Sequence, residues 1–509
     1  MRKSLIAVGV IVILGAAWTG AAWYTGKQFE QRLPALLDEA NARIKTAFPE
    51  AGVTLAVQDY HPALFSRRLD VVLLSDGSTG DNKPLKPGDQ LILNEIVDHG
   101  PFPFAQLKKG VFIPSMASVQ SRLAETPFVK PLIEASQGKS PVSAVTRVGY
   151  NGDTVSVIDF APLDYKDADS LIRSSGGSLN AAIDHDLNKV ILTGALSSLV
   201  VAGESQFQQR EQVTLHDVSI DSDTHKGKQG YSIGDNTLKV KSLIYNLDGK
   251  DMLNTDNLSQ VTTANEDGDK LNVQVAYSLD MLHVQGQEFG SGKLIIKLSN
   301  LDAKAIAQFS DQYHNQVQQI MQQTGAADPA AQQEQITQAL INNLPVALKG
   351  NPYLSISPLS WKNSKGESAF NLTLNVNDPS QLPPGAPAAT PELQLARFVN
   401  KLDAKLTIPL DMATELTTQF AKIQGYNADE AQKLAKQQVQ GLAAMGQMFK
   451  LTTVDDNVLS SSFHYADNQV NLNGQKMSLQ NFLGLFGLSG VPDSPTQPVQ
   501  PQAVPQPQR

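Results

Sequence analysis

Hydrophobic and polar residues alternate along much of this chain with a period of two. Three segments show it most clearly, "LNVQVAYSL" (271–279), "FNLTLNV" (370–376) and "LDAKLTIPL" (402–410). In each, every second residue is apolar and the residues between are mostly polar or small. This pattern is typical of strands in an antiparallel sheet that has one apolar face and one polar face.

Turn signals separate several of the strand-like segments. Asn151-Gly152, Asp267-Gly268 and Asn473-Gly474 are dipeptides that favour tight hairpins. Pro409 stands late in its segment and lacks a backbone N–H, which indicates a strand end or an edge strand.

Helical periodicity is concentrated in the C-terminal half. We expect one helix around 306–320, a second from Asp328-Pro329 to Pro345, and a third after a capping box at Asn427 and Glu430. Each carries an apolar stripe that we expect to pack against a sheet, although Met445 and Met448 would also suit an adaptable binding surface. The stripes are Ile306/Phe309/Tyr313/Val317/Ile320, Ile336/Leu340/Leu344 and Leu434/Leu442/Met445/Phe449.

The order of these segments suggests a duplication. A strand–helix–helix–strand unit is predicted for 251–376 and a second for 394–490, joined by the Pro-rich linker 377–393. A β-rich region, 27–250, precedes them, and the Pro/Gln-rich tail 491–509 is expected to be disordered.

The N-terminus predicts a membrane anchor. After "MRKS", residues 5–24 contain no charge, and as a helix they would span about 30 Å, the thickness of the hydrocarbon core. Trp18, Trp23 and Tyr24 lie near the far end, where aromatic rings favour the membrane interface. We therefore assign 1–26 to an uncleaved, single-pass signal anchor. A cleaved signal peptide with Leu5–Leu14 as its apolar core is the alternative, and in both cases the bulk of the chain is exported.

Together these features predict an α+β protein. A single N-terminal transmembrane helix precedes a large, mainly antiparallel β-sheet periplasmic body, with several amphipathic helices in the C-terminal half.

Composition excludes several classes of function. The net charge of −9 argues against a nucleic-acid-binding protein, which needs a basic surface. The absence of cysteine excludes disulfides, thiolate catalysis and cysteine-ligated metals.

The sequence offers little catalytic chemistry. "QGKS" (137–140) ends like a phosphate-binding loop, but Ile133 stands where the first glycine is needed. "DSDTHKG" (221–227) begins like a calcium loop, but Lys226 replaces the obligatory glycine. The histidines are scattered, so we expect neither an enzyme nor a metal or cofactor site.

The octet "VDHGPFPF" (97–104) is the most unusual local motif, and its signature residues are His99, Gly100, Pro101, Phe102, Pro103 and Phe104. Each proline disfavours a helical conformation in the residue before it. We therefore predict that a strand ends at His99 and that "PFPF" leaves it as an extended bend with both phenylalanines buried. His99 is interpreted as structural, hydrogen-bonded to backbone or to a carboxylate, rather than catalytic.

Several long segments carry a family resemblance. "VDHGPFPFAQLKKG", "GSGKLIIKL", "PLSWKNSKGESAFNLTL", "LDAKLTIPLDMATE" and "WTGAAWYTGK" resemble the YdgA-like family of enteric bacteria over essentially the whole chain. The resemblance implies an inner-membrane anchor and a periplasmic body, and because the family's function is unknown it implies no catalytic residues.

Two classes of function remain. In the first, a continuous apolar sheet face forms a groove that handles lipid, as the similarity of this architecture to AsmA-like lipid-transport proteins suggests at the level of fold alone. In the second, the chain is an envelope scaffold that binds other proteins through sheet edges, helices or the tail. The expected partners are thus the inner membrane and either lipid or envelope proteins.

Overall fold

The computed structural model describes residues 52–77, 85–167, 170–205, 207–324, 329–381 and 398–485, together with most positions of a helical stretch between Glu30 and Lys45. The predicted membrane segment, with Trp18, Trp23 and Tyr24, lies outside the described residues, as do the tail and residues 382–393 of the linker. The first residues of the linker are described, and Pro379–Gln381 form a 3-10 turn. Within the described residues, no helix has the length and apolar character needed to cross a membrane.

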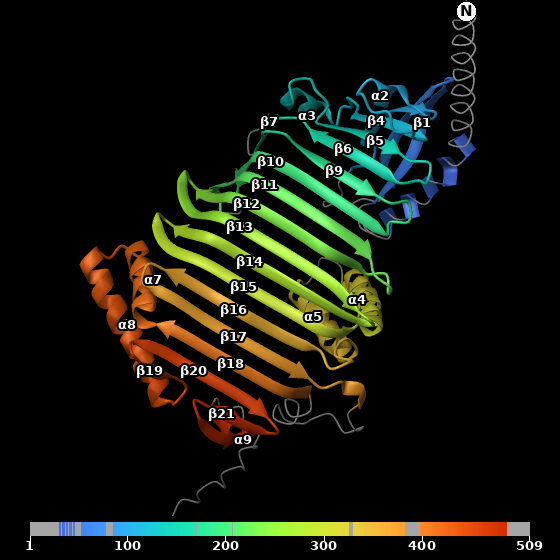
Figure 1. Cartoon of the computed structure of the whole chain (residues 1–509). Helices are drawn as coiled ribbons and strands as arrows, with labels where there is room; N and C mark the ends of the chain where they lie inside the picture. Colours follow the sequence, from blue (N-terminus) through green and yellow to red (C-terminus); the bar gives the residue numbers. More distant parts are fainter. Residues whose placement is uncertain are drawn as a thin grey trace, which may run out of the picture. The chain divides into compact units, whose positions relative to one another are not determined.

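The chain forms two compact units. Figure 1 labels the helices and strands in chain order. The first unit comprises residues 1–297, 358–368 and 411–439, and the second comprises 298–357, 369–410 and 440–509. Strand and helix order runs β15, α4, α5, β16, β17 and later β18, α7, α8, β19, β20. The strand–helix–helix–strand order therefore occurs twice, and the predicted domain boundaries stay a prediction.

Most of the first unit is one open antiparallel sheet, as the alternating pattern predicted. Its strands are β1 (Val53–Pro62), β2 (Ser66–Ser75), β3 (Gln90–His99), β4 (Ala117–Leu123), β5 (Val142–Val148), β6 (Thr154–Phe160), β7 (Leu163–Lys166), β8 (Leu171–Ser174), β9 (Gly177–Ile183), β10 (Lys189–Glu204), β11 (Arg210–Lys226), β12 (Ser232–Leu247), β13 (Lys250–Asp267) and β14 (Lys270–Val284). They pair in the order β1, β2, β3, β4, β5, β6, β9, β10, β11, β12, β13, β14. The hairpin β7–β8 pairs with the second half of β10.

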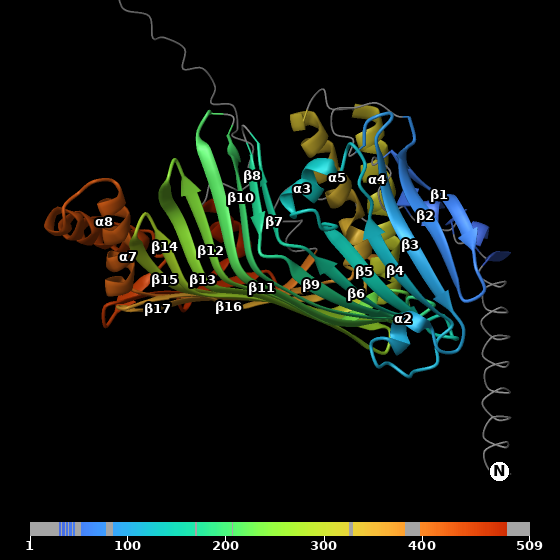
Figure 2. The ribbon, with the colours of Figure 1, turned by 90° about the horizontal axis from the view of Figure 1, so that it is seen from above.

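The long strands of this sheet are bent. Figure 2 shows β10–β14 changing direction part of the way along their length. Asp217 in β11 and Asn257 in β13 have positive φ angles of 48° and 51°, a left-handed conformation that aspartate and asparagine tolerate better than most residues. Asp217 pairs with Lys241 at 3.2 Å, and the Asn257 amide donates to Asp280 at 2.8 Å. These side chains join neighbouring strands at the bend.

The strands β15 (Gln287–Asp302), β16 (Tyr353–Asn363) and β17 (Gly366–Val376) have residues in both units. Within the first unit, the Trp361 indole N–H donates to the carbonyl of Phe289 at 2.7 Å. Phe289 in turn packs edge-on against Phe420 of α7 (Leu410–Ile423). The second glycine of "GSG" (290–292) has a structural reason here, because a Cβ on Gly292 would lie 2.6 Å from the Trp361 ring.

A smaller antiparallel ladder lies in the second unit. After β17 it contains β18 (Val399–Pro409), β20 (Val458–Ala466), β21 (Gln469–Leu472) and β22 (Gln475–Ser478), and β19 (Thr453–Asp455) also pairs with β20. Its apolar face packs against α9 (Leu479–Gly484) in a core around Tyr465, Val470 and Leu483. The helices α4 (Ala303–Thr324) and α5 (Pro329–Ala347) pack on each other.

Local sequence signals correctly predicted where several strands and helices begin or end. Asn473 and Gly474 both have positive φ between the paired residues Leu472 and Gln475, as their hairpin requires. The Asn427 carboxamide accepts the Glu430 N–H at 3.0 Å and caps α8 (Ala428–Met448). Pro409 is the last residue of β18.

The predicted buried stripes of α5 and α8 are wrong. Leu340 and Leu344 of α5 are exposed, as are Leu442 and Met445 of α8 and Phe449, which directly follows α8. Only Ile336 and Leu434 of the two stripes are partly buried. Small residues are buried instead, because an alanine face lets the helix backbone approach its neighbours more closely; in α8 these are Ala431, Ala435, Val439 and Ala443. Pro345 lies inside α5, which ends two residues later than predicted.

Candidate functional site

Two neighbouring rows of side chains form an apolar band on one face of the first unit's sheet. Residues directly opposite each other on paired strands share a face, so the strand register defines both rows. The first row is Ala144, Ile158, Leu179, Gly194, Ile220 and Leu238. The second row is Val142, Phe160, Gly177, Leu196, Val218, Val240 and Leu258. We call these residues, with Gln260 and Tyr277 that extend the first row, the apolar band.

Much of the apolar band is uncovered. Phe160, Ile220, Leu238 and Tyr277 are each between 40% and 44% exposed, whereas large apolar side chains of a packed sheet face are normally covered. A contiguous apolar surface of this kind is typical of a binding site.

A hollow lies in the middle of the apolar band. It has a volume of about 350 Å³ and is lined chiefly by Phe160, Leu179, Leu196, Val218 and Ile220. Gly177 and Gly194 also line it, and their missing side chains create the space. At Gly194, a Cβ would lie 3.0 Å from Leu179 and 3.1 Å from Ile220. The hollow is therefore apolar and open toward the same face as the band.

Polar residues border the band. In the next row toward the strand ends, the polar residues Ser222, Asn236 and Thr262 stand between the apolar residues Leu192 and Val275. The Ser222 hydroxyl donates to the Asn236 carboxamide oxygen at 2.6 Å. On the other side, the strands reach the bend at Asp217 and Asn257. The band is thus a limited apolar strip that runs across the strands rather than along them.

The octet "VDHGPFPF" (97–104) lies in the same unit, at the end of β3. Gly100 has a φ of 101°, a conformation that glycine adopts without strain, and its N–H bonds the carbonyl of Met116. The Pro101 carbonyl accepts the N–H of Ser115 at 2.9 Å. The octet therefore begins the connection from β3 to β4, and the structural role assigned to it stays a prediction.

The predicted extended bend with two buried phenylalanines is wrong in two details. Residues Phe104–Leu107 form a single helical turn, α2, because the Asp98 carboxylate accepts the Ala105 N–H at 3.1 Å and Pro103 precedes the turn. Phe104 is 40% exposed and contacts Phe65 edge-on, while Phe102 is half-buried and Pro103 is buried.

His99 is buried beside a buried arginine. An Arg67 guanidinium nitrogen lies 2.6 Å from His99 Nε2, and because arginine can only donate, Nε2 is the acceptor. Arg67 also donates to the Tyr60 hydroxyl and pairs with Glu30 at 3.5 Å. Burial and the positive charge of Arg67 lower the pKa of His99 to about 4. His99 is thus neutral at pH 7, which suits a structural acceptor.

Two carboxyl groups are buried nearby on β3. Burial raises the pKa of Glu95 to about 7, although the hydrogen bond from the Ser121 hydroxyl at 2.6 Å lowers it in part. Burial also raises the pKa of Asp98 above its usual value, against the opposing effects of the Ala105 N–H and Lys108. Glu95 lies in register with the first row of the apolar band, through Ser121 and Ala144.

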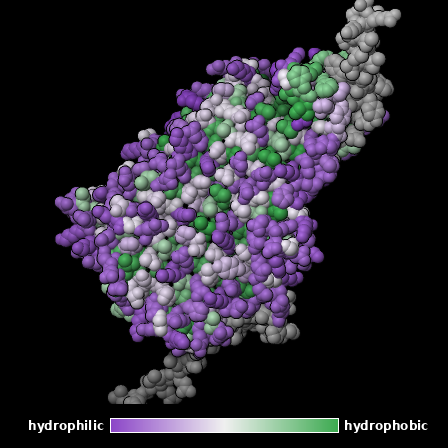
Figure 3. Space-filling model, in the orientation of Figure 1, coloured by the Kyte–Doolittle hydropathy of each residue, from purple (hydrophilic) through white to green (hydrophobic). Residues whose placement is uncertain are grey.

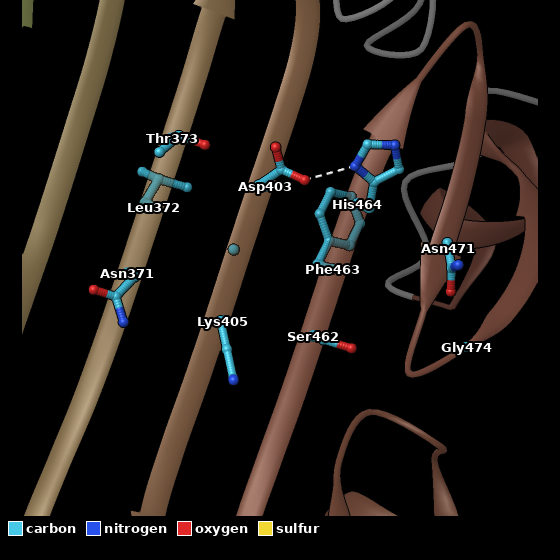
Figure 4. Close-up of a pocket in the computed structure, with 11 residues that line it drawn as sticks. Asn371, Leu372, Thr373, Asp403, Lys405, Ser462, Phe463, His464, Asn471 and Gly474 are labelled. Atoms are coloured by element: carbon cyan, nitrogen blue, oxygen red, sulfur yellow. Dashed lines mark hydrogen bonds and ion pairs between the residues drawn. The ribbon is translucent and has the colours of Figure 1, made fainter.

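A second hollow lies on the polar face of the second unit's ladder (Figure 4). It measures about 490 Å³ and contains an Asp403–His464 pair, with 2.6 Å between the carboxylate and Nδ1. Desolvation favours a higher pKa for Asp403, but hydrogen bonds from His464 and Lys401 outweigh it and lower the pKa. Ser462 lies two residues before His464 on β20, and its hydroxyl points away from the imidazole ring (Figure 4). A histidine oriented by an aspartate, without a nucleophile beside it, makes no catalytic triad.

Sequence reasoning missed both the Asp403–His464 pair and the apolar band. The alternating pattern placed Asp403 on a polar strand face, but no signal paired it with a residue 61 positions away. Likewise, the pattern identified apolar residues strand by strand but not the register that aligns them. Among the described residues, no group of three or more potential ligands could hold a metal ion.

Comparison with known proteins gives a family and relatives but no activity. The family model described as "Bacterial protein of unknown function (DUF945)" matches residues 1–480. The chain is 43% identical to Protein YdgA of Escherichia coli K12 over 96% of this chain and 97% of that protein. It is 29% identical to the uncharacterized protein YihF of the same organism, over 96% and 99% of the two chains. No solved structure matches.

Proposed function

Because this chain belongs to the DUF945 family of bacterial proteins, whose function is unknown, we propose that it is a membrane-anchored envelope protein that binds lipid. The apolar band holds acyl chains, residues 1–26 anchor the chain in the inner membrane, and the body lies in the periplasm. The protein catalyses no reaction. The observation that carries this proposal is the uncovered apolar band with its hollow at Gly177 and Gly194.

The dimensions of the band suit an acyl chain. From Ile158 on β6 to Tyr277 on β14 the first row crosses six strand spacings, about 29 Å at about 4.8 Å each. Two acyl chains end to end span the hydrocarbon core of about 30 Å. One acyl chain laid across the strands would therefore occupy about half of the row.

The energetics also favour an apolar ligand. Each methylene group removed from water contributes about 0.8 kcal/mol. A chain lying in the band would also cover side chains such as Ile220 and Leu238, which are otherwise in contact with water. The polar row at Ser222 and Asn236 would limit sideways movement of the ligand.

Site-specific photo-cross-linking in cells tests the proposal. A photoreactive amino acid would replace Ile220 or Leu238 in the full-length protein, and the adducts would be identified by mass spectrometry. Asp221 and Lys239 are the matched controls, because they are adjacent, exposed and on the opposite face. Phospholipid adducts at 220 and 238 but not at 221 and 239 are expected. Equal labelling of the two faces would contradict the proposal.

A protein scaffold is the second candidate. The observation that favours it is the exposed C-terminal part of α8 and the residue after it, where Leu442, Met445, Met448 and Phe449 are between 47% and 70% exposed. Flexible methionine side chains adapt to different partners. The same photoreactive residue at 445 would give protein adducts of defined mass if the scaffold function dominates, with positions 220 and 238 free of lipid.

A further inference from the structure

We propose that one end of the first unit's sheet rests on the membrane surface, in the headgroup region of the bilayer that holds the anchor. This inference rests on the anchor in the proposed function and adds a second, independent contact with lipid. The contact consists of residues 61–66, which comprise the last two residues of β1 and the turn into β2, and residues 100–114, which lead from β3 toward β4. We call these two loops the end surface.

The end surface exposes large apolar side chains. Phe112 is 72% exposed, Ile113 54% and Leu64 50%, and Phe104 is also exposed. Figure 3 shows hydrophobic residues gathered over α2 and β4, at this end of the unit. Single exposed apolar residues are common on protein surfaces. Four large ones in two adjacent loops indicate a surface that binds another molecule.

The two loops form one surface. The His99 N–H donates to the carbonyl of Phe65 at 2.8 Å, and the rings of Phe65 and Phe104 pack edge-on with centroids 5.6 Å apart. Within the second loop, the Val111 N–H bonds the carbonyl of Gln106. The Ser115 N–H bonds the carbonyl of Pro101, so the backbone is hydrogen-bonded within the loop on both sides of Phe112 and Ile113.

The charge of the end surface matches an anionic membrane. Neither loop of the end surface contains an aspartate or glutamate, although the whole chain carries a net charge of −9; the nearest acidic residues along the chain are Asp59, Asp70, Asp98 and Glu125. Arg68, Lys108 and Lys109 are at least partly exposed at this end. Apolar and aromatic side chains flanked by lysine and arginine are typical of protein surfaces that lie in the membrane interface.

The chain leading to the anchor reaches the same end of the sheet. Glu30 pairs with Arg67, which follows the first loop directly. Glu30 stands only six positions after Tyr24, the last residue of the predicted membrane segment. Six residues reach at most about 20 Å even when fully extended. The membrane surface must therefore lie close to the end surface, and this proximity favours lipid over a protein partner as its occupant.

The absence of cysteine allows a direct test. Phe112→Cys and Phe207→Cys each give the full-length protein a single thiol for an environment-sensitive dye. Phe207 is the matched control, since it is an 83% exposed phenylalanine in the β10–β11 connection at the opposite strand ends. Both proteins would be reconstituted into vesicles of phosphatidylethanolamine and phosphatidylglycerol that contain brominated acyl chains.

The dye at 112 is expected to shift its emission to the blue and to be quenched several-fold more than the dye at 207. Lys108→Glu/Lys109→Glu in the Phe112→Cys background should reduce that quenching. Equal quenching at 112 and 207 in protein that floats with the vesicles would overturn the end-surface contact while leaving the anchor intact. Failure of the protein to float would overturn the anchor and this contact together. Adducts with a protein at position 112 in cells, without quenching in vesicles, would replace lipid by a protein partner and also overturn it. None of these outcomes depends on lipid in the apolar band.

Discussion

The guanidinium of Arg67 donates to Nε2 of His99 at 2.6 Å, inside the sheet of the first unit. Both side chains are buried, and their hydrogen bond joins β2 to the end of β3, where the loop 100–114 begins. The neutral His99 accepts a hydrogen bond from the Arg67 guanidinium, whose positive charge would otherwise be costly to bury.

Removing this acceptor is expected to destabilise the first unit. His99→Ala leaves a cavity and deprives the buried guanidinium of a partner, so the free energy of unfolding should fall by about 2–4 kcal/mol at pH 7. His99→Gln should cost less, because a carboxamide oxygen can accept the same hydrogen bond. Urea unfolding of the detergent-solubilised full chain measures both. Equal losses for the two variants would show that the hydrogen bond contributes little.

The same histidine predicts sensitivity to acid. The pKa of His99 is about 4 in the folded protein, against an ordinary value of 6.5 in the unfolded chain, so the unfolded chain binds more protons between these values. Its contribution to stability is therefore retained above pH 6.5 and lost as the pH falls toward 4, by up to about 3 kcal/mol. His99→Gln should flatten this part of the pH profile of the thermal midpoint. An unchanged slope in the variant would contradict the assignment.

Glu95 predicts the opposite pH dependence, a stability that falls as the pH rises. Its pKa is about 7 in the folded protein, against an ordinary value of 4.5 in the unfolded chain, so the folded state holds the extra proton in that window. Stability from this group is present below pH 4.5 and is lost as the pH rises through 7, by up to about 3 kcal/mol. Glu95→Gln should raise the thermal midpoint at pH 8 more than at pH 5. Glu125→Gln, at a position closer to solvent, is the control and should change neither.

A charge in the apolar band should expel its ligand. Ile220→Lys places an ammonium group beside the hollow, and we expect lipid co-purifying with the protein to fall by about tenfold, which corresponds to about 1.4 kcal/mol. Ser219→Lys adds the same charge to the opposite face and should leave lipid unchanged. Mass spectrometry of extracts from both variants gives the comparison. If Ser219→Lys loses as much lipid as Ile220→Lys, the band is not the binding site.

Local patterns predicted the strands better than the assembly of strands. Alternation in "LNVQVAYSL" suffices to identify β14, because burial of one sheet face imposes it. It does not reveal that Tyr277 lies in one row with Ile158, six strands away, since that depends on the register of every intervening pair. The prediction that the apolar stripe of α8 is its buried face failed for a related reason. Large apolar residues recur at helical spacing on one face, yet the packed face is the one that carries Ala431 and Ala435.

The glycine–tryptophan contact predicts a specific packing defect. Gly292 faces the ring of Trp361, and an added Cβ would lie 2.6 Å from it, closer than packed carbons approach. Because Trp361 is held by its hydrogen bond to the Phe289 carbonyl, the ring has little freedom to move away. Gly292→Ala should therefore cost about 1–3 kcal/mol through overpacking. With Trp18 and Trp23 replaced by phenylalanine, Trp361 fluorescence would report the disturbance directly, because the chain has only three tryptophans.

Gly441→Ala is the matched control for that defect. Gly441 lies in α8, and a Cβ added there would meet no atom within 4 Å beyond the adjoining backbone of its own helix, so alanine should stabilise the helix by up to about 1 kcal/mol. The double variant Gly292→Ala/Trp361→Phe should recover part of the lost stability, since the smaller ring vacates the space that the new methyl group needs. If the double variant is instead less stable by the sum of its two single changes, the two residues do not interact and the assigned contact is wrong.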